Sequence, residues 1–285
     1  MGSRSLPLLC LVAVAITTGW IGESHAAPPV EVNSCGQFAT KGFLGGDLDC
    51  TGFPGDAVTI ERSLDLNGFT LTGGLLSAVT CLKSCKINGP GTITGSGAFG
   101  VNIHGVGKVT EVNLTDNGLA GVQCFEKCKV RGPATISGNG NNGVRASSAT
   151  IRDVVLSGNS GPAVEAQNNK QRGRAKLRDS IVTGNGSGVL ADRKVVLRDT
   201  TVSGNGQFGI LSGDSPICEK RGVAVLRDSN VTGNGIDVEC GVTIACADVA
   251  TCMGTPKLKG TATCDTSYMV GSGVPGDDWD TCALD

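Results

Sequence analysis

The 285-residue sequence is poor in aromatic side chains, with only 7 Phe, 2 Trp and 1 Tyr. Because it also contains 44 Gly, its core must be built from small and β-branched side chains packed between closely spaced backbones. No single sign of charge dominates, since 24 Lys and Arg oppose 26 Asp and Glu. This balance argues against a strongly basic nucleic-acid-binding protein. The hydrophobic content of 39% argues against a disordered chain.

A long apolar run is found only at the N-terminus. Arg4 precedes the run at residues 6–16, and Ser24-His25-Ala26 follows as a small-x-small cleavage site. This order is typical of a secretory signal peptide, which we place at residues 1–26. A membrane anchor is the alternative, but the run is shorter than the roughly 20 residues that a span needs. We therefore expect a secreted, cell-surface or periplasmic protein without a membrane span.

Signal removal would also remove Cys10 and leave an even number of cysteines, which is typical of disulfides formed in an oxidising compartment. Zinc is the competing interpretation, but CLKSC and CFEKC lack the C-x-x-C spacing and His104 is the only remaining imidazole. We therefore predict no metal site. The cysteines predicted to form disulfides are Cys35, Cys50, Cys81, Cys85, Cys124, Cys128, Cys218, Cys240, Cys246, Cys252, Cys264 and Cys282.

One short pattern recurs along the chain as LTGG, ITGS, LTDN, ISGN, LSGN, VTGN, VSGN and VTGN. Successive copies are separated by 22, 21, 22, 20, 26, 20 and 29 residues, which indicates a solenoid. No window shows the 3.6-residue periodicity of a helix, so the repeat is predicted to be all-β. The copies end at Gly74, Ser96, Asn117, Asn139, Asn159, Asn185, Asn205 and Asn234.

Aligning the repeats predicts two files of inward-facing aliphatic residues. In a coil whose strands pair in parallel with the next coil, about 4.8 Å away, equivalent residues stack on one another. The Asn side chains of the turns are expected to adopt left-handed backbone geometry and to hydrogen-bond their copies. One file contains Ile93, Leu114, Ile136, Leu156, Val182, Val202 and Val231; the other contains Val101, Val122, Val144, Val164, Val189, Ile210 and Val238.

Two cysteine-containing segments are near-copies of each other. CLKSCKINGPGTITG and CFEKCKVRGPATISG begin 43 residues apart, which corresponds to two coils and roughly 10 Å along the axis. That separation is too large for a disulfide between the segments. We therefore predict the local disulfides Cys81–Cys85 and Cys124–Cys128.

The Gly-Asn turns, LDLNGFTLTG at residues 64–73 and GPGTITG at residues 89–95 resemble secreted right-handed parallel β-helix proteins with short repeats, of the pectate-lyase-like superfold. The resemblance covers residues 35–243 and implies an all-β, right-handed parallel β-helix of about eight coils at residues 64–243. It also implies an N-terminal cap at 27–63, which a Cys35–Cys50 disulfide would staple. Residues 244–285 are interpreted as a Cys-rich C-terminal cap, with a separate small binding module as the alternative.

The resemblance does not fix an activity. Pectate-lyase-like sites combine a calcium-binding carboxylate cluster with an Arg base, and polygalacturonase-like sites use NTD, DD, GHG and RIK segments. None of the latter occurs here, and the nearest fragment is NIHG at residues 102–105, whose His104 has no DD partner. No cofactor is expected, except calcium if the chain is a lyase.

Two groups of charged residues are candidate sites. The first follows the inward file at constant spacing and is a charge ladder or, alternatively, a catalytic or calcium-binding face; it contains Arg152, Asp153, Arg178, Asp179, Arg198, Asp199, Arg227 and Asp228. Insertions at one edge of the coils supply the second, a basic seam that could hold an anionic polymer or be solvated loop charge. The seam contains Lys170, Arg172, Arg174, Arg193, Lys194, Lys220 and Arg221.

The sequence thus predicts a monomeric, non-catalytic protein that binds a glycan or another envelope polymer, with no nucleic-acid partner. One alternative is a polysaccharide lyase or other carbohydrate-active enzyme acting on an acidic polysaccharide. The other alternative is a purely structural or adhesive surface repeat protein.

Overall fold

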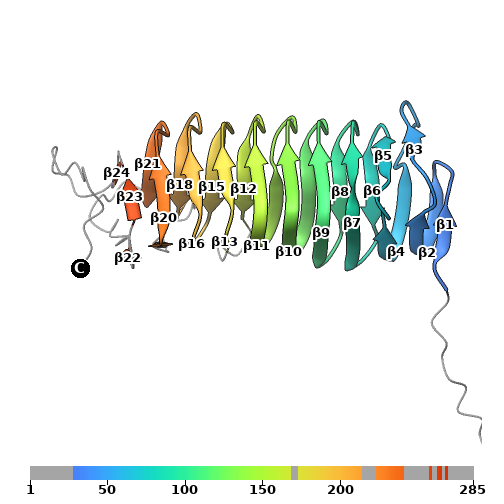
Figure 1. Cartoon of the computed structure of the whole chain (residues 1–285), viewed down its shortest axis with the longest axis horizontal. Coiled ribbons are helices and arrows are strands. Elements are labelled where there is room, and N and C mark those ends of the chain that lie inside the picture. Colours follow the sequence, from blue (N-terminus) through green and yellow to red (C-terminus); the bar gives the residue numbers. More distant parts are fainter. Residues whose placement is uncertain are drawn as a thin grey trace, which may run out of the picture.

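The computed structural model describes residues 28–167, 173–213 and 223–240, together with short strands at 257–258, 262–264 and 267–268. The described chain is an all-β parallel solenoid, and the expected repeats form about eight of its turns. Its strands lie side by side across the long axis (Figure 1). The described residues include no helix that is long and apolar enough to cross a membrane.

Each turn contributes one strand to each of three sheets, which we call faces A, B and C in chain order. Face A contains β6 (Ser77–Cys81), β8 (Phe99–Ile103), β12 (Pro162–Ala166), β15 (Ser187–Ala191), β18 (Phe208–Ser212), β21 (Ile236–Cys240) and β24 (Ser267–Tyr268). Face B contains β1 (Val30–Val32), β13 (Arg174–Arg178), β16 (Lys194–Arg198), β19 (Val223–Arg227) and β22 (Lys257–Leu258). Face C contains β3 (Leu48–Cys50), β5 (Thr70–Gly73), β14 (Ile181–Thr183), β17 (Thr201–Ser203), β20 (Ser229–Thr232) and β23 (Ala262–Cys264).

Other strands continue around a corner and belong to more than one face. Faces A and B share β2 (Gln37–Leu44) and β4 (Val58–Asp65), and faces B and C share β7 (Cys85–Thr94) and β9 (Gly107–Thr115). All three faces include parts of β10 (Ala120–Ser137) and β11 (Val144–Ser157), whose pairing shifts register at the corners.

The core consists of stacked aliphatic files, as predicted from the repeats. On face C, Ile136 pairs with both Leu114 and Leu156, and on face A, Val122 pairs with both Val101 and Val144. These six side chains are fully buried. Face B adds a third inward file that the sequence alignment had not singled out, and it contains Leu64, Ile87, Val109, Val130, Ile151, Leu177, Leu197 and Leu226.

The parallel pairing extends beyond residues 64–243 at both ends. Gln37 in β2 pairs with Val58 in β4, and Val58 pairs with Val79 in β6. The expected boundary between residues 63 and 64 therefore falls inside β4. At the other end, β22, β23 and β24 pair in parallel with β19, β20 and β21. The proposed signal peptide at residues 1–26 lies outside the described residues.

The turn between faces C and A contains the predicted ladder of buried asparagines. Asn117 donates from Nδ2 to Asn139 Oδ1 across 2.9 Å, and the same contact recurs in each later turn as far as Asn234. The expectation that Asn itself takes left-handed geometry is wrong. The residue before it does so, as at Gly158 with φ 63° and Asp116 with φ 54°, because Gly and Asp tolerate this conformation.

Three disulfides lie in the described part of the chain. Cys81–Cys85 and Cys124–Cys128 bridge the corner between faces A and B, as predicted, and Cys35–Cys50 closes the first described turn. The side chains of the remaining predicted cysteines lie outside the described residues; these are Cys218, Cys240, Cys246, Cys252, Cys264 and Cys282.

Candidate binding face

Face B carries a row of stacked arginines on its outer surface. Arg178 pairs in register with Arg152 on one side and Arg198 on the other, and the row extends to Arg131 and Arg227 at its ends. We call these five residues the Arg file. Four are exposed and Arg227 is half-buried. Because adjacent parallel strands lie about 4.8 Å apart, the file presents evenly spaced guanidinium groups along the axis.

The aspartates that follow these arginines form the corner between faces B and C. Asp153, Asp179, Asp199 and Asp228 have φ values of 55°, 49°, 46° and 48°, so each makes the left-handed turn that ends its face B strand. Their recurrence therefore has a backbone cause, because Asp is one of the few residues that tolerate this geometry.

Two of the corner aspartates, Asp153 and Asp179, also pair with the Arg file. Asp179 Oδ2 lies 3.1 Å from Arg178 Nε and 3.6 Å from Arg152 Nε, and thus bridges two turns. Arg152 Nε also lies 3.1 Å from Asp153 Oδ2. All three ion pairs use Nε, so they orient each guanidinium without occupying its two terminal nitrogens. The pairs are partly exposed and contribute little to stability on their own.

A second file runs beside the Arg file along the middle of face B, and we call it the central file. Lys108 pairs with Lys86 and Lys129, and Lys129 pairs with Thr150. Thr150 in turn pairs with Lys176. Toward the C-terminus the file changes character, because Lys176 is followed by Val196 and Val225.

The basic seam lies at the opposite edge of face B. Arg174 pairs with Lys194 in neighbouring strands, and Arg193 occupies the adjacent corner, where it lines a shallow depression together with Arg174. The structure therefore brings part of the seam and the Arg–Asp residues to the two edges of one face. The remaining seam residues, Lys170, Arg172, Lys220 and Arg221, lie outside the described residues.

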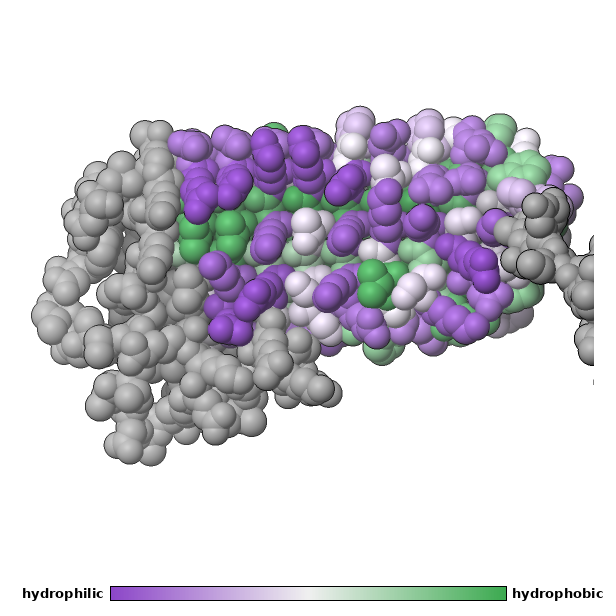
Figure 2. Space-filling model, turned by 90° about the horizontal axis from the view of Figure 1, so that it is seen from below, coloured by the Kyte–Doolittle hydropathy of each residue, from purple (hydrophilic) through white to green (hydrophobic). Residues whose placement is uncertain are grey.

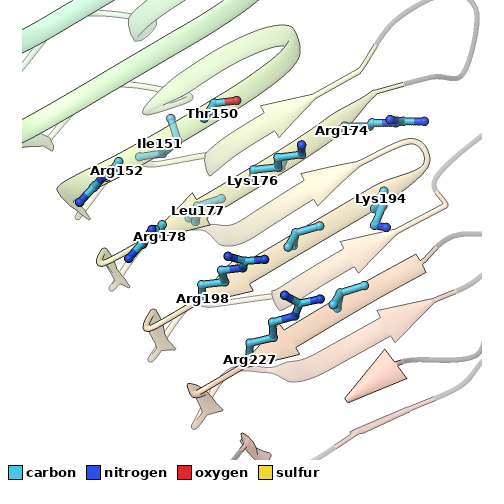
Figure 3. A pocket seen from close by; sticks show the side chains of 13 residues that line it. Thr150, Ile151, Arg152, Arg174, Lys176, Leu177, Arg178, Lys194, Arg198 and Arg227 are labelled. Carbon is cyan, nitrogen blue, oxygen red and sulfur yellow. The ribbon is translucent and has the colours of Figure 1, made fainter. Parts of the chain in front are cut away.

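Between these edges the surface is hollowed over a volume of about 500 Å³. Figure 3 shows Arg152, Arg178, Arg198 and Arg227 in line along one side of the hollow, with Arg174 and Lys194 on the other. Figure 2 shows rows of hydrophilic side chains running along one side of the solenoid, with a hydrophobic patch near its C-terminal end.

Sequence reasoning missed Arg131, the lysines of the central file and the hollow. Arg131 is followed by Gly132 and Pro133 rather than by Asp, so the Arg-Asp motif does not mark it. The central file mixes Lys, Thr and Val, and therefore gives no repeat signal until the register is known.

His104 does not lie in the hollow. Its ring packs edge-to-face on Phe125, with 5.3 Å between the ring centroids, at the corner between faces A and B. The structure thus gives the NIHG fragment a packing contact. Within the described residues, no three His, Cys, Asp or Glu side chains are grouped so that they could hold a metal ion.

Two carboxyl groups that belong neither to the Arg file, nor to the central file, nor to the basic seam have perturbed pKa values. The Thr51 hydroxyl donates to Asp49 Oδ1 across 2.7 Å and lowers the pKa of Asp49. Lys83 Nζ lies 2.8 Å from Glu61 Oε1, and this hydrogen-bonded ion pair lowers the pKa of Glu61. Both carboxyl groups are therefore anions at neutral pH.

No family model matches this chain, and neither the curated proteins nor the solved structures contain a significant match to it. The fold and the face together define a parallel β-solenoid with a cationic track along its axis.

Proposed function

We propose that the protein binds an acidic polysaccharide of the cell envelope or its surroundings along face B, without cleaving it. The observation that carries this proposal is the Arg file, in which five successive turns present a guanidinium group in register. A protein of net charge −2 that aligns arginines and lysines along one face favours an extended anionic partner.

The geometry favours a linear polymer over a compact anion. The Arg file and the lysines of the central file run parallel to the axis, so a polymer lying along the axis meets another cation at each rise of about 4.8 Å. Each exposed contact is weak, at about 0.2–1 kcal/mol, but linked contacts act together on one chain. The terminal guanidinium nitrogens offer a fork that matches carboxylate or sulfate groups.

The test is retention on immobilised polygalacturonate, alginate and heparin, with dextran as the uncharged polymer. We compare the parent with a face B variant, Arg131→Gln, Arg178→Gln and Arg198→Gln. The matched control loses the same charge away from the Arg file, at the corner between faces A and B and on face A, and it carries Arg62→Gln, Lys83→Gln and Arg145→Gln. At physiological ionic strength, we expect the face B variant to lose retention and the control to keep it.

Equal losses in the two variants would show that retention follows net charge and would overturn the assignment to face B. A parent that binds no acidic polymer would favour the structural or adhesive alternative. Release of unsaturated sugars from any of these polymers would favour the lyase alternative. Tighter binding to single-stranded DNA than to every polysaccharide would contradict the proposed class of partner.

A further inference from the structure

The hollow on face B has an apolar floor at its C-terminal end. Val196 and Val225 point outward at positions where earlier turns of the central file place Lys86, Lys108 and Lys129. Val225 is only 8% exposed although it lies on the outer side of its strand, and it lines the hollow. This end of the face therefore differs from the rest of the cationic track.

The rims of the hollow carry cations on both sides of Val196, and beside Val225 the Arg file continues on one side. Arg198 and Arg227 continue the Arg file on one side, while Arg174 and Lys194 form the other side (Figure 3). The volume of about 500 Å³ lies within the range of small-molecule sites. The floor suits a hydrocarbon group, and the rims suit an anion attached to it.

Arg227 provides an independent indication of a ligand. Within the described part of the chain, Arg227 Nε is buried and meets no hydrogen-bond acceptor. In the same file, Nε of Arg152 and Nε of Arg178 are both engaged by aspartate. A buried donor without an acceptor is unfavourable, and an anion bound in the hollow would remove that cost.

We propose that the hollow binds an anionic amphiphile, in which an acyl chain lies on Val196 and Val225 and the attached anionic group meets Arg198 and Arg227. This inference rests on the proposed function, since the natural occupant is an acyl substituent of the acidic glycan that lies along face B. It identifies the ligand as an acylated acidic glycan rather than a purely hydrophilic one.

The probes are octyl sulfate below its micelle concentration, methyl sulfate and octyl glucoside, with binding measured by isothermal titration calorimetry. Octyl and methyl sulfate share an anionic head and differ only in the tail, while octyl glucoside keeps the tail and lacks the charge. For the parent, we expect octyl sulfate to bind at least about tenfold more tightly than methyl sulfate, a difference of about 1.4 kcal/mol. Octyl glucoside should bind more weakly than octyl sulfate.

The test variant carries Val196→Thr and Val225→Thr, because Thr keeps the β-branched shape and already occupies this file at position 150. We expect it to lose most of the advantage of octyl sulfate while methyl sulfate binding is unchanged. The matched control, Ser63→Val, replaces a hydroxyl side chain by valine at the distant end of the same file. It should leave the affinities for all three probes unchanged.

The two proposals fail in different ways. Equal binding of octyl and methyl sulfate by a parent that is retained on acidic polysaccharides would overturn the amphiphile site and leave the proposed function intact. A preference for octyl sulfate that depends on the valines, in a protein that no polysaccharide retains, would support the hollow as a site for free amphiphiles and overturn the proposed function. Equal binding of octyl glucoside and octyl sulfate would overturn the anionic requirement.

Discussion

Asn139 donates its side-chain amide to Asn159 Oδ1 across 2.7 Å, and its backbone N–H donates to the same oxygen across 3.2 Å. The second amide hydrogen of Asn139 is donated to the carbonyl oxygen of Leu114 in the preceding turn. The Asn139 side chain therefore satisfies a backbone carbonyl of the preceding turn and also bonds the side chain of the next rung. The rungs that follow repeat the arrangement, so removal of one Asn leaves buried donors in the neighbouring turn without an acceptor.

Replacing Asn159 by Leu is expected to destabilise the fold. The substitution removes the oxygen that accepts from the backbone N–H and the side-chain amide of Asn139. It also removes the amide that donates to Asn185 Oδ1, and all these groups are buried. A cost of about 1–3 kcal/mol follows from each unsatisfied group, and thermal unfolding should show a Tm lower by several degrees. Asn230→Leu is the control, because Asn230 is exposed on face C. An unchanged Tm for Asn159→Leu would contradict a structural role of the ladder.

Gly158 tests the left-handed turn that precedes the ladder residue. Its φ is 63°, and the nearest heavy atom to a new Cβ would be 4.0 Å away, so there is room for a side chain but not a favourable backbone geometry. Gly158→Ala should therefore cost about 1 kcal/mol. Gly158→Asp should cost less, because Asp116 occupies the equivalent position with φ 54°. Urea unfolding of the two variants measures the difference, and equal costs would argue against backbone strain as the cause.

Asp179 is expected to restrain binding at face B, since it contacts both Arg152 and Arg178. Asp179→Asn removes the charge while keeping a residue that tolerates φ near 49°. We expect tighter retention on acidic polysaccharides and a Tm close to that of the parent. Asp116→Asn, at a left-handed position outside face B, is the matched control. If both variants increase retention equally, the effect comes from net charge and not from released arginines.

The disulfides should differ in their contributions to stability. Cys35 and Cys50 are separated by 15 residues, whereas the two local pairs are each separated by 4. In the chain-entropy account, a 15-residue loop is worth about 3 kcal/mol and a shorter loop less. Denaturant unfolding of Cys35→Ser/Cys50→Ser should therefore show a larger loss than Cys81→Ser/Cys85→Ser. The opposite order would mean that the corner between faces A and B depends on its disulfide more than the first turn does.

The pH dependence of retention can identify the acidic group of the polymer. Arginine stays protonated at all accessible pH values, whereas a carboxylate is neutralised as the pH falls below about 4. Retention on polygalacturonate should therefore decline in that range, while retention on a sulfated polymer should persist. The comparison is made above the onset of acid unfolding, monitored by circular dichroism. Parallel losses for both polymers with the fold intact would contradict binding through the arginines.

The sequence predicts those parts of the fold whose residues repeat in kind. Ile136 and Val122 belong to files in which every member is aliphatic, so alignment of the turns is enough to place them. The same holds for the Asn ladder. The left-handed position was assigned one residue too late, because Asn and Gly both tolerate that geometry and only the backbone distinguishes them.

The candidate face was harder to predict because its residues do not repeat in kind. Thr150, Lys176 and Val196 share a file but not a chemistry, and insertions between faces A and B change their spacing in the sequence. The sequence separates the two groups of charges by motif, yet only the register shows that Arg174 and Arg178 lie on the same strand of one face.

The hydrogen bonds from one Asn side chain to the next all run in one direction, from each turn toward the next turn along the chain. If a turn carrying Gly-Asn were duplicated, its Asn would accept a hydrogen bond from the Asn before it and donate one to the Asn after it. No other residue would have to change. The same duplication would add one row to face B and lengthen the cationic track by about 4.8 Å. The length of this face can thus change in whole-turn increments, and under the proposed function selection for longer ligands would act on repeat number without redesign of any contact.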